Sequence, residues 1–123
     1  MLINDFFSIT QWQSDAGSIH AAIDINPQHK IFEGHFPGQP VVPGVCMLQI
    51  IKEILESELK KKLTLVQSDY IKFLSMIDPQ KTTDIHADLN FQLAEDSRIL
   101  LNASLFNEGA VYMKMKGVFA DAL

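Results

Sequence analysis

The feature that most constrains this chain is a long stretch without helix breakers. Residues 45–63 contain no Gly or Pro. A helix is therefore predicted to start after Pro43 and to run through about Lys61. Its first half is apolar nearly all round, at Val45, Cys46, Met47, Leu48, Ile50 and Ile51. A helix of that kind is stable only when most of its circumference is covered, so the rest of the chain is expected to wrap around it.

Five further segments have the character of strands. Apolar and polar residues alternate with the period of a half-buried strand in residues 19–26, 85–93 and 101–106. Residues 64–73 are rich in β-branched and aromatic side chains, and residues 110–119 follow a turn cluster. Short strands joined by such turns form antiparallel meanders. We therefore predict an α+β fold in which an antiparallel β-sheet is wrapped around one long central helix, whose N-terminus lies on the concave side.

Length and composition exclude several classes of protein. The 123 residues suit one domain, residues 1–123, and 47% hydrophobic with 20% charged residues is typical of a soluble globular protein. A net charge of −5 disfavours nucleic-acid binding. The single cysteine cannot form an internal disulfide, and no residue group has metal-ligand spacing, so no metal or cofactor is expected. Without an apolar span or an N-terminal cationic region, the chain is expected to be cytoplasmic and to bind no membrane.

Residues 31–44 differ from an ordinary loop. They contain three prolines, three glycines and His35. The prolines fix backbone angles and the glycines allow turns, so this segment is expected to be stiff and extended and to hold His35 in one orientation. On spacing alone, a Pro/Gly-rich connector with an incidental His fits equally well.

The order of the residues favours the functional interpretation. Residues 34–45, Gly-His-Phe-Pro-Gly-Gln-Pro-Val-Val-Pro-Gly-Val, strongly resemble the active-site segment of 3-hydroxyacyl-[acyl-carrier-protein] dehydratases, the hot-dog-fold enzymes of fatty-acid biosynthesis. Tyr70-Ile71-Lys72-Phe73 with the following Pro79, and Asn107-Glu108-Gly109 with the closing strand, are also similar to that family. The resemblance covers residues 28–119.

The resemblance implies a fold, an assembly and a reaction. It implies a hot-dog fold and a homodimer, or a hexamer built of dimers, with the two sheets joined edge to edge and the active sites at the shared interface. The implied reaction is dehydration of a 3-hydroxyacyl thioester, carried by acyl carrier protein or coenzyme A, to the trans-2-enoyl thioester. Such a hydro-lyase must remove a proton from C2, expel the C3 oxygen and stabilise the charge that gathers on the thioester carbonyl.

Each of these tasks has a candidate residue by similarity. His35 takes the role of base, because imidazole titrates near neutral pH. The Gly44 N–H takes the oxyanion role with the Val45 N–H beside it, because the first N–H groups of a helix are unpaired. Pro43 cannot donate, which leaves Gly44 as the first donor. Phe36, Pro43 and Val45 are expected to contact the substrate.

The chain departs from the family at the helix acid. The family carries Glu or Asp fourteen residues after the His, and that count leads from His35 to Gln49. Gln can hold a water or a hydroxyl but cannot ionise. Glu53 lies one turn further along the helix and Glu33 precedes the His, but both are expected to be solvated. The third alternative is a heterodimer with a paralogous chain that carries Glu at the matching position, since the family's sites combine the His of one protomer with the acid of the other.

Other residues carry weaker signals. His20 and His86 lie on the polar phases of their strands and are expected to face outward, while His29 could flank the entrance to the site. Cys46 is expected to be a packed apolar residue rather than a nucleophile. The roles of two further groups of residues remain open. Four methionines could line an acyl tunnel or fill the core: Met47, Met76, Met113 and Met115. Several cations could bind an acidic carrier: Lys30, Lys72, Arg98 and the run 60–62.

Two other functions are consistent with these residues. A thioesterase on the same fold is one, although it too normally needs a carboxylate on the helix. A non-catalytic subunit that binds an acyl chain or shapes a partner is the other. Gln49 favours the binding subunit, whereas the complete segment from His35 to Gly44 favours the dehydratase.

Overall fold

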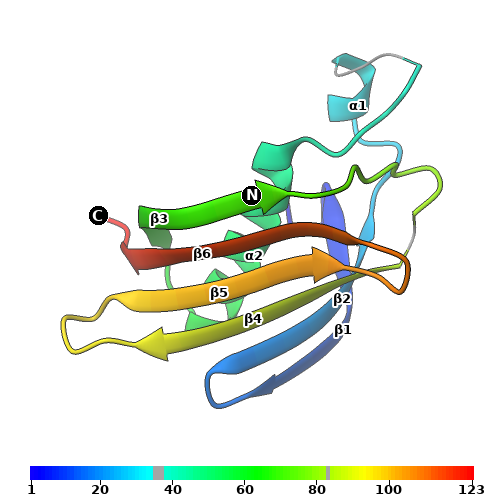
Figure 1. The fold of residues 1–123 in the computed structure, drawn as a ribbon. Helices are drawn as coiled ribbons and strands as arrows, with labels where there is room; N and C mark the ends of the chain where they lie inside the picture. The colour runs from blue at the N-terminus through cyan, green and yellow to red at the C-terminus, as the bar shows by residue number, and fades with distance from the viewer. Residues whose placement is uncertain (35–37, 83) are drawn as a thin grey trace.

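The computed structural model describes residues 1–34, 38–82 and 84–123. These residues form one six-stranded sheet with the strand order β1-β2-β4-β5-β6-β3 (Figure 1). The elements in chain order are β1 (Phe7–Asp15), β2 (Ser18–Ile25), α1 (Ile31–Gly34), α2 (Gly44–Leu59), β3 (Leu63–Phe73), β4 (Ile85–Leu93), β5 (Ile99–Phe106) and β6 (Val111–Asp121). The prediction of one long helix and an antiparallel sheet is confirmed.

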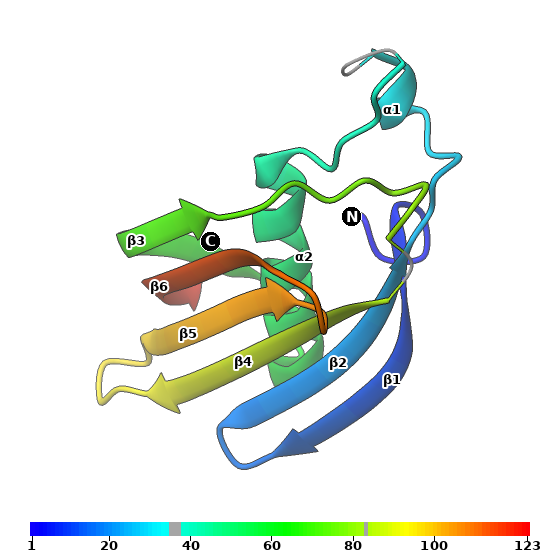
Figure 2. The ribbon, with the colours of Figure 1, turned by 45° about the vertical axis from the view of Figure 1, so that its right-hand side comes forward.

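The long helix α2 lies against the concave face of the sheet, which curls around it (Figure 2). Its apolar side chains, together with those of the inner sheet face, form one continuous core. Four side chains of α2 are fully buried: Ile50, Ile51, Ile54 and Leu55. Full burial of a Leu or Ile side chain contributes roughly 1.5–3 kcal/mol. The apolar circumference of α2 thus explains why the sheet must curl.

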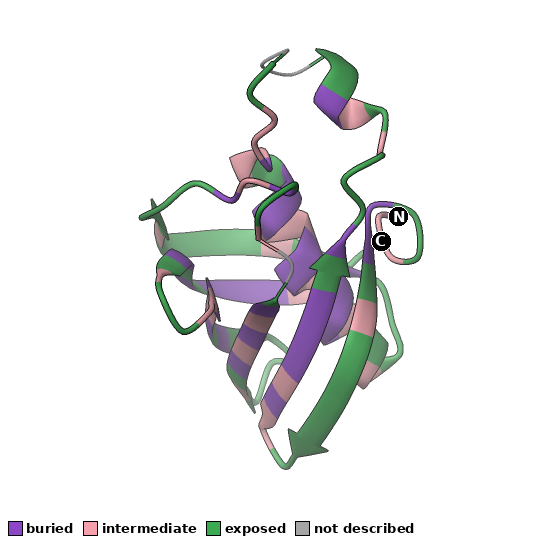
Figure 3. Cartoon of the chain, turned by 90° about the vertical axis from the view of Figure 1, so that its right-hand side faces the viewer, coloured by how far each residue is buried: buried purple, intermediate pink, exposed green. Residues whose placement is uncertain are grey.

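The strands alternate between the core and the outer face, as the period-two pattern predicted. Along β5 the burial alternates almost strictly, with Ile99, Leu101 and Leu105 inside. Figure 3 shows the same banding of buried and more exposed residues on the sheet. All five strand pairs are antiparallel, and β4, β5 and β6 form the predicted meander.

The strand β1 was not predicted. It pairs with β2 alone and therefore forms one edge of the sheet. Only Phe7 of this strand is buried, and the register shifts between Ile9 and Gln11. An edge strand with a bulge and two largely exposed faces has no apolar alternation, so the period-two signal was missing.

The segment before α2 is not extended throughout, in contrast to the prediction. Residues 31–34 form one short helical turn, α1, with Phe32 buried and Glu33 exposed. The backbone N–H groups of Phe32 and Glu33 donate to the carbonyl oxygens of His29 and Lys30. The prediction of an extended backbone is therefore wrong for residues 31–34, whereas Pro43, just before α2, is extended.

The other boundaries agree closely with the predictions. The helix α2 ends at Leu59, two residues before the predicted end, because Lys60 adopts the left-handed conformation with φ 58°. Its N–H donates to Glu56 O, which closes the helix. Among the described residues no helix is long and apolar enough to cross a membrane.

Candidate active site

The N-terminus of α2 presents unpaired backbone donors. Pro43 precedes the helix in an extended conformation, and its carbonyl oxygen accepts the N–H groups of Cys46 and Met47 at 3.0 and 3.2 Å. Within the part of the chain that the structure describes, the N–H groups of Gly44 and Val45 have no hydrogen-bond partner. They are the two donors that the sequence predicted for a thioester carbonyl.

An apolar pocket of about 460 Å³ opens at this helix end. Its lining comes from the segment before α2, the first turn of α2, and the end of β3 with the connection that follows: Val41, Val42, Pro43, Gly44, Met47, Phe73, Leu74, Ser75 and Met76. Carbon and sulfur atoms dominate this lining, so the pocket suits a hydrocarbon chain better than a polar ligand.

Phe73 is a pocket residue to which the sequence assigned no role of its own. A Cβ atom added to Gly44 would lie only 2.9 Å from the tip of the Phe73 ring. The ring therefore lies directly over the start of α2, and only Gly leaves room for it there. The sequence did point to this position, because Phe73 ends a segment that resembles the dehydratases, but it did not indicate what the side chain does.

The predicted site residues are only partly described. His35 and Phe36 lie outside the described residues, so their roles stay predictions. Pro43 and Gly44 line the pocket, whereas the Val45 side chain is 75% exposed and is absent from the pocket lining. Gln49 lies further along α2 and is also absent from that lining.

Gln49 is tied to Glu53, one turn further along α2. Its Nε2 donates to Glu53 Oε2 at 2.9 Å. The Glu53 carboxylate also accepts the backbone N–H groups of Leu2, at 2.8 Å to Oε2, and of Ile3, at 2.8 Å to Oε1. Glu53 is 1% exposed, so the expectation that it is solvated is wrong.

This hydrogen-bond network determines whether a nearby carboxylate can replace the acid that the family carries at position 49. Both oxygens of Glu53 already accept hydrogen bonds from N–H donors, which leaves no free carboxylate to replace the family's acid. Glu33 is exposed at the end of α1, as expected. The arrangement can hold a carbonyl oxygen and an acyl chain, but the one carboxylate that the described residues place beside Gln49, that of Glu53, is already engaged by N–H donors.

His29 fixes the chain before α1. Its Nδ1 accepts the Ile31 N–H at 3.1 Å, and its Nε2 therefore carries the proton and donates to Asp5 at 3.1 Å. The ring also packs edge-on against Phe6. His29 thus joins the N-terminal segment to the start of α1, close to the Pro/Gly-rich segment whose entrance it was predicted to flank.

His20 and His86 lie on the sheet, away from this region. His20 Nδ1 contacts Asp88 Oδ1 at 2.5 Å, and His86 Nδ1 lies 3.2 Å from His20 Nε2. These residues lie on β2 and β4, in the outward phase opposite to the buried positions. Both rings are partly exposed, which agrees with the prediction.

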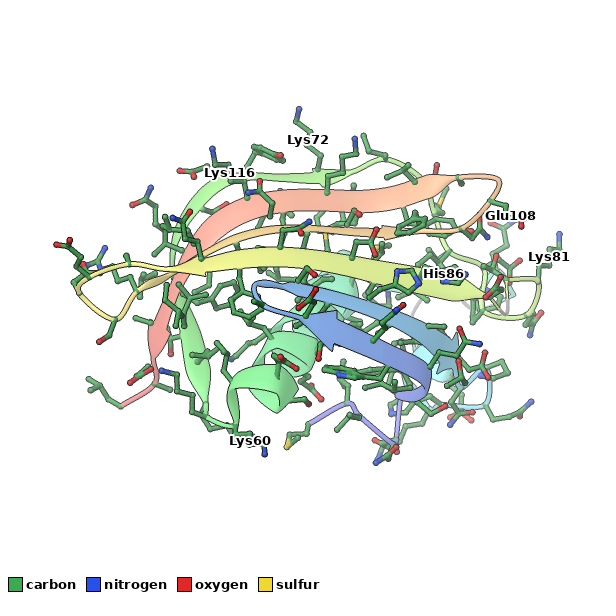
Figure 4. The ribbon with its side chains drawn as sticks, turned by 90° about the horizontal axis from the view of Figure 1, so that it is seen from below. Lys60, Lys72, Lys81, His86, Glu108 and Lys116 are labelled. Atoms are coloured by element: carbon green, nitrogen blue, oxygen red, sulfur yellow. The ribbon has the colours of Figure 1, made fainter. Side chains whose placement is uncertain are left out.

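The candidate cations do not come together. Lys30 lies before α1, Lys72 on β3, and Arg98 in the connection between β4 and β5, where it pairs with Asp96. Lys72 instead lies opposite Lys114 in the β3–β6 register. Figure 4 shows Lys72 pointing away from α2 on the outer face of the sheet, with Lys116 on the same side.

The sulfur-containing residues divide between core and pocket. Cys46 is buried, and burial raises the pKa of its thiol, which supports the prediction of a packed apolar residue. Met47, Met113 and Met115 belong to the core, and Met47 also lines the pocket together with the exposed Met76. Across residues 1–34, 38–82 and 84–123, no group of three or more His, Cys, Asp or Glu residues could hold a metal ion.

The family model for ApeI-like dehydratases matches residues 11–104 of this chain. The chain belongs to the ApeI-like dehydratase family. The resemblance to hydroxyacyl dehydratases found in the sequence is thereby confirmed. This family match covers the sheet strands β2 and β4, the whole of α2 and the pocket lining.

Named relatives agree with this ApeI-like assignment. The 3-hydroxyacyl-[acyl-carrier-protein] dehydratase FabZ of Rickettsia bellii is 29% identical over 98 residues, which cover 73% of this chain and 68% of the relative. The enzyme of the same name from Rickettsia felis is 27% identical over 112 residues, covering 85% of this chain and 77% of the relative.

Solved structures show that this ApeI-like chain has the hot-dog fold. The dehydratase heterocomplex ApeI:P from Xenorhabdus doucetiae matches with a TM-score of 0.70 at 18% identity, over 91% of this chain and 96% of that one. A mutant thioesterase from Pseudomonas aeruginosa matches with a TM-score of 0.62 at 10% identity, over 91% and 79%. At these identities the likeness concerns the fold alone.

Proposed function

We propose that this chain is a subunit of a 3-hydroxyacyl thioester dehydratase, a hydro-lyase that produces the trans-2-enoyl thioester. The observation that carries the proposal is the pair of N–H groups at Gly44 and Val45, which have no partner among the described residues and open beside an apolar pocket of about 460 Å³. Unpaired donors suit a thioester oxygen and the pocket suits an acyl chain. Membership of the ApeI-like family and the relatives named as acyl-carrier-protein dehydratases support the reaction type and the carrier.

The proposed reaction assigns each proton and electron pair. His35 removes the proton from C2, and the electron pair moves toward the thioester carbonyl, whose oxygen is held by the Gly44 N–H. The pair then returns to form the C2–C3 double bond as the C3–O bond breaks. The departing hydroxyl takes up a proton and leaves as water, which requires an acid.

The acid is the part that this chain does not supply from position 49. Gln49 cannot ionise, and Glu53 is occupied by three N–H donors. We therefore propose that the acid for His35 comes from a partner chain with Glu at the matching position. The dehydratase heterocomplex among the fold neighbours supports a pair of unlike subunits.

The strand β3 is the proposed joining edge. It pairs with β6 on one side and lies at the end of the sheet. Its exposed apolar side chains, Val66, Tyr70 and Phe73, are 47%, 37% and 52% exposed. An unpaired edge with exposed apolar residues favours pairing with another strand, in a homodimer or with a paralogue.

The test uses a short 3-hydroxyacyl pantetheine thioester and follows the enoyl absorbance in both directions. Three samples are compared: the native chain, His35→Ala, and an equimolar mixture of native chain with the acid-bearing variant His35→Ala/Gln49→Glu/Glu53→Gln. In this variant the amide introduced at position 53 donates to the new carboxylate. Only a site shared between two protomers can combine native His35 with that carboxylate.

The outcomes separate the alternatives. Turnover by the native chain that His35→Ala abolishes supports the dehydratase and shows that Gln49 suffices. A silent native chain that becomes active only in the mixture supports the partner-dependent site. Silence in all three samples overturns the proposal in favour of a binding subunit, and release of free thiol without enoyl product overturns it in favour of a thioesterase.

A further inference from the structure

Glu53 is a buried carboxylate that the proposed reaction does not use. Ile50 and Ile54, which lie near it on α2, are fully buried core residues, and Glu53 itself is 1% exposed. A buried carboxylate without partners would strongly destabilise a protein. Here three donors satisfy it: the N–H groups of Leu2 and Ile3 and the side-chain amide of Gln49.

This arrangement determines which end of the Gln49 amide is free. A carboxylate that accepts from two backbone N–H groups needs a further donor, not another acceptor, on the side of Gln49. Gln49 therefore turns its NH₂ group toward Glu53, at 2.9 Å. Its carbonyl oxygen, Oε1, faces elsewhere, and among the described residues no donor contacts it.

We infer that Glu53 is a positioning residue that makes position 49 a hydrogen-bond acceptor and so selects acyl thioesters with a hydroxyl donor at C3. The inference rests on the proposed function, in which the position that matches Gln49 meets the C3 oxygen of the substrate; in a pair of identical chains, that position carries Gln49. A 3-hydroxyl group can donate to Gln49 Oε1. A 3-oxo group cannot, because it carries acceptors only.

A single isosteric change inverts this polarity. In Glu53→Gln the introduced amide oxygen accepts hydrogen bonds from the N–H groups of Leu2 and Ile3. These bonds hold the N-terminal segment in place. The NH₂ group of the introduced amide then faces Gln49, whose amide must turn to offer Oε1 to that donor. The free end of Gln49 becomes NH₂, which favours a 3-oxo acceptor over a 3-hydroxyl donor.

The experiment measures binding rather than turnover. Dissociation constants of 3-hydroxyoctanoyl and 3-oxooctanoyl pantetheine are determined by calorimetry for the native chain, Glu53→Gln and Gln49→Ala, the catalytic His35 being replaced by Ala throughout to prevent turnover. The native background is expected to favour the 3-hydroxy compound about three- to tenfold, the net effect of one hydrogen bond. Glu53→Gln is expected to reverse that ratio, and Gln49→Ala to bring it to about one.

Two further readings keep the result unambiguous. Hydrogen exchange of the Leu2 and Ile3 amides shows whether Glu53→Gln retains the contacts of the N-terminal segment. If Glu53 had a merely structural role, a change in these contacts would be the only effect of the variant. With those amides still protected, an unchanged ligand ratio overturns the inference while leaving the proposed function in place. Failure of the native background to bind either compound overturns the proposed function, and the inference with it.

Discussion

Residues 43–47, at the start of α2, and residues 49–53, one turn further along, differ in how far their polar groups are satisfied by hydrogen bonds within the chain. At the helix start, the N–H groups of Gly44 and Val45 are unpaired among the described residues and open beside an apolar pocket. One turn later, a buried carboxylate and a side-chain amide satisfy each other together with two backbone N–H groups. The first region has spare hydrogen-bonding capacity for a ligand, whereas the second uses nearly all of its capacity internally.

This difference separates two parts of a dehydratase site. One part is formed by the backbone at a helix start, and the other depends on a titratable side chain. A helix start and an apolar pocket persist under many substitutions, because they depend on the fold. An acid depends on one side chain, and here Gln49 stands in its place beside a carboxylate that already anchors the N-terminal segment. Changes at the two regions should therefore affect different properties.

The largest expected effect is on stability and comes from Glu53→Ala. The substitution leaves the N–H groups of Leu2 and Ile3 and the amide of Gln49 without their acceptor. A buried unsatisfied donor costs about 1–3 kcal/mol, and these three donors are partly buried, so the free energy of unfolding should fall by about 3 kcal/mol. Urea unfolding measures this change.

Glu56→Ala is the matched control for that variant. Glu56 lies three residues further along α2 and accepts one backbone N–H, from Leu63 at 2.8 Å. Its removal is expected to cost about 1 kcal/mol. Equal losses for the two variants would contradict the view that Glu53 is the centre of the network.

The next effect is on ligand binding and comes from Gly44→Ala. The new Cβ would lie 2.9–3.2 Å from three atoms of the Phe73 ring, which must move toward the pocket. Because Phe73 is 52% exposed, the ring can move without breaking the core, so stability should change by less than about 1 kcal/mol. Affinity for an acyl pantetheine should fall about tenfold, equivalent to ~1.4 kcal/mol.

Two companion variants sharpen the comparison at Gly44. Gly34→Ala adds the same methyl group at a position where no atom of the described residues lies within 4 Å of the new Cβ, so it should leave both stability and affinity nearly unchanged. Gly44→Ala/Phe73→Leu should recover affinity, because the shorter side chain leaves space for the methyl group. If affinity is retained in Gly44→Ala itself, the pocket at the start of α2 is not the acyl site.

The sequence allowed the first region to be predicted far better than the second. The helix start, the Pro43–Gly44 boundary and the apolar circumference all followed from local rules, and the structure agrees with them. Position 49 was singled out through the resemblance to a known motif, and its role stays a prediction. These features depend on residues that are close together along the chain or on a well-defined spacing.

Glu53 could not be predicted in the same way, because its partners are 50 and 51 residues away in the sequence. Its charged neighbours indicated a solvated helix face, although its spacing from Ile50 and Ile54 would also have suited a buried position. The edge strand β1 was missed for a related reason, since its exposed side chains carry no periodic signal. Long-range satisfaction of polar groups and edge position leave little trace in a local pattern.

A smaller effect on stability is expected for Gln49→Leu. Leu has a similar size but donates no hydrogen bond, so Glu53 keeps its two backbone partners and loses the third donor. The free energy of unfolding should fall by about 1 kcal/mol, the net contribution of one hydrogen bond. Urea unfolding of this variant beside Glu53→Ala tests whether the network is centred on position 53, and a loss as large as that of Glu53→Ala would contradict it.

The smallest effect concerns Cys46, which reports how well the start of α2 excludes water. Burial raises the pKa of its thiol, so the folded protein holds this proton at pH values where the unfolded chain has lost it. Stability from this group is therefore present below about pH 9 and is lost as the pH rises beyond it. Cys46→Ala should remove that part of the decline measured by urea unfolding between pH 8 and about 10.5. At pH 8 the native thiol should also react with a disulfide reagent more slowly than in the urea-unfolded chain, because its burial and its raised pKa both lower the amount of reactive thiolate. Equal rates in the two states would show that the first turn of α2 is open to water. The first turn and the buried Glu53 network would then differ in solvent access as well as in hydrogen bonding.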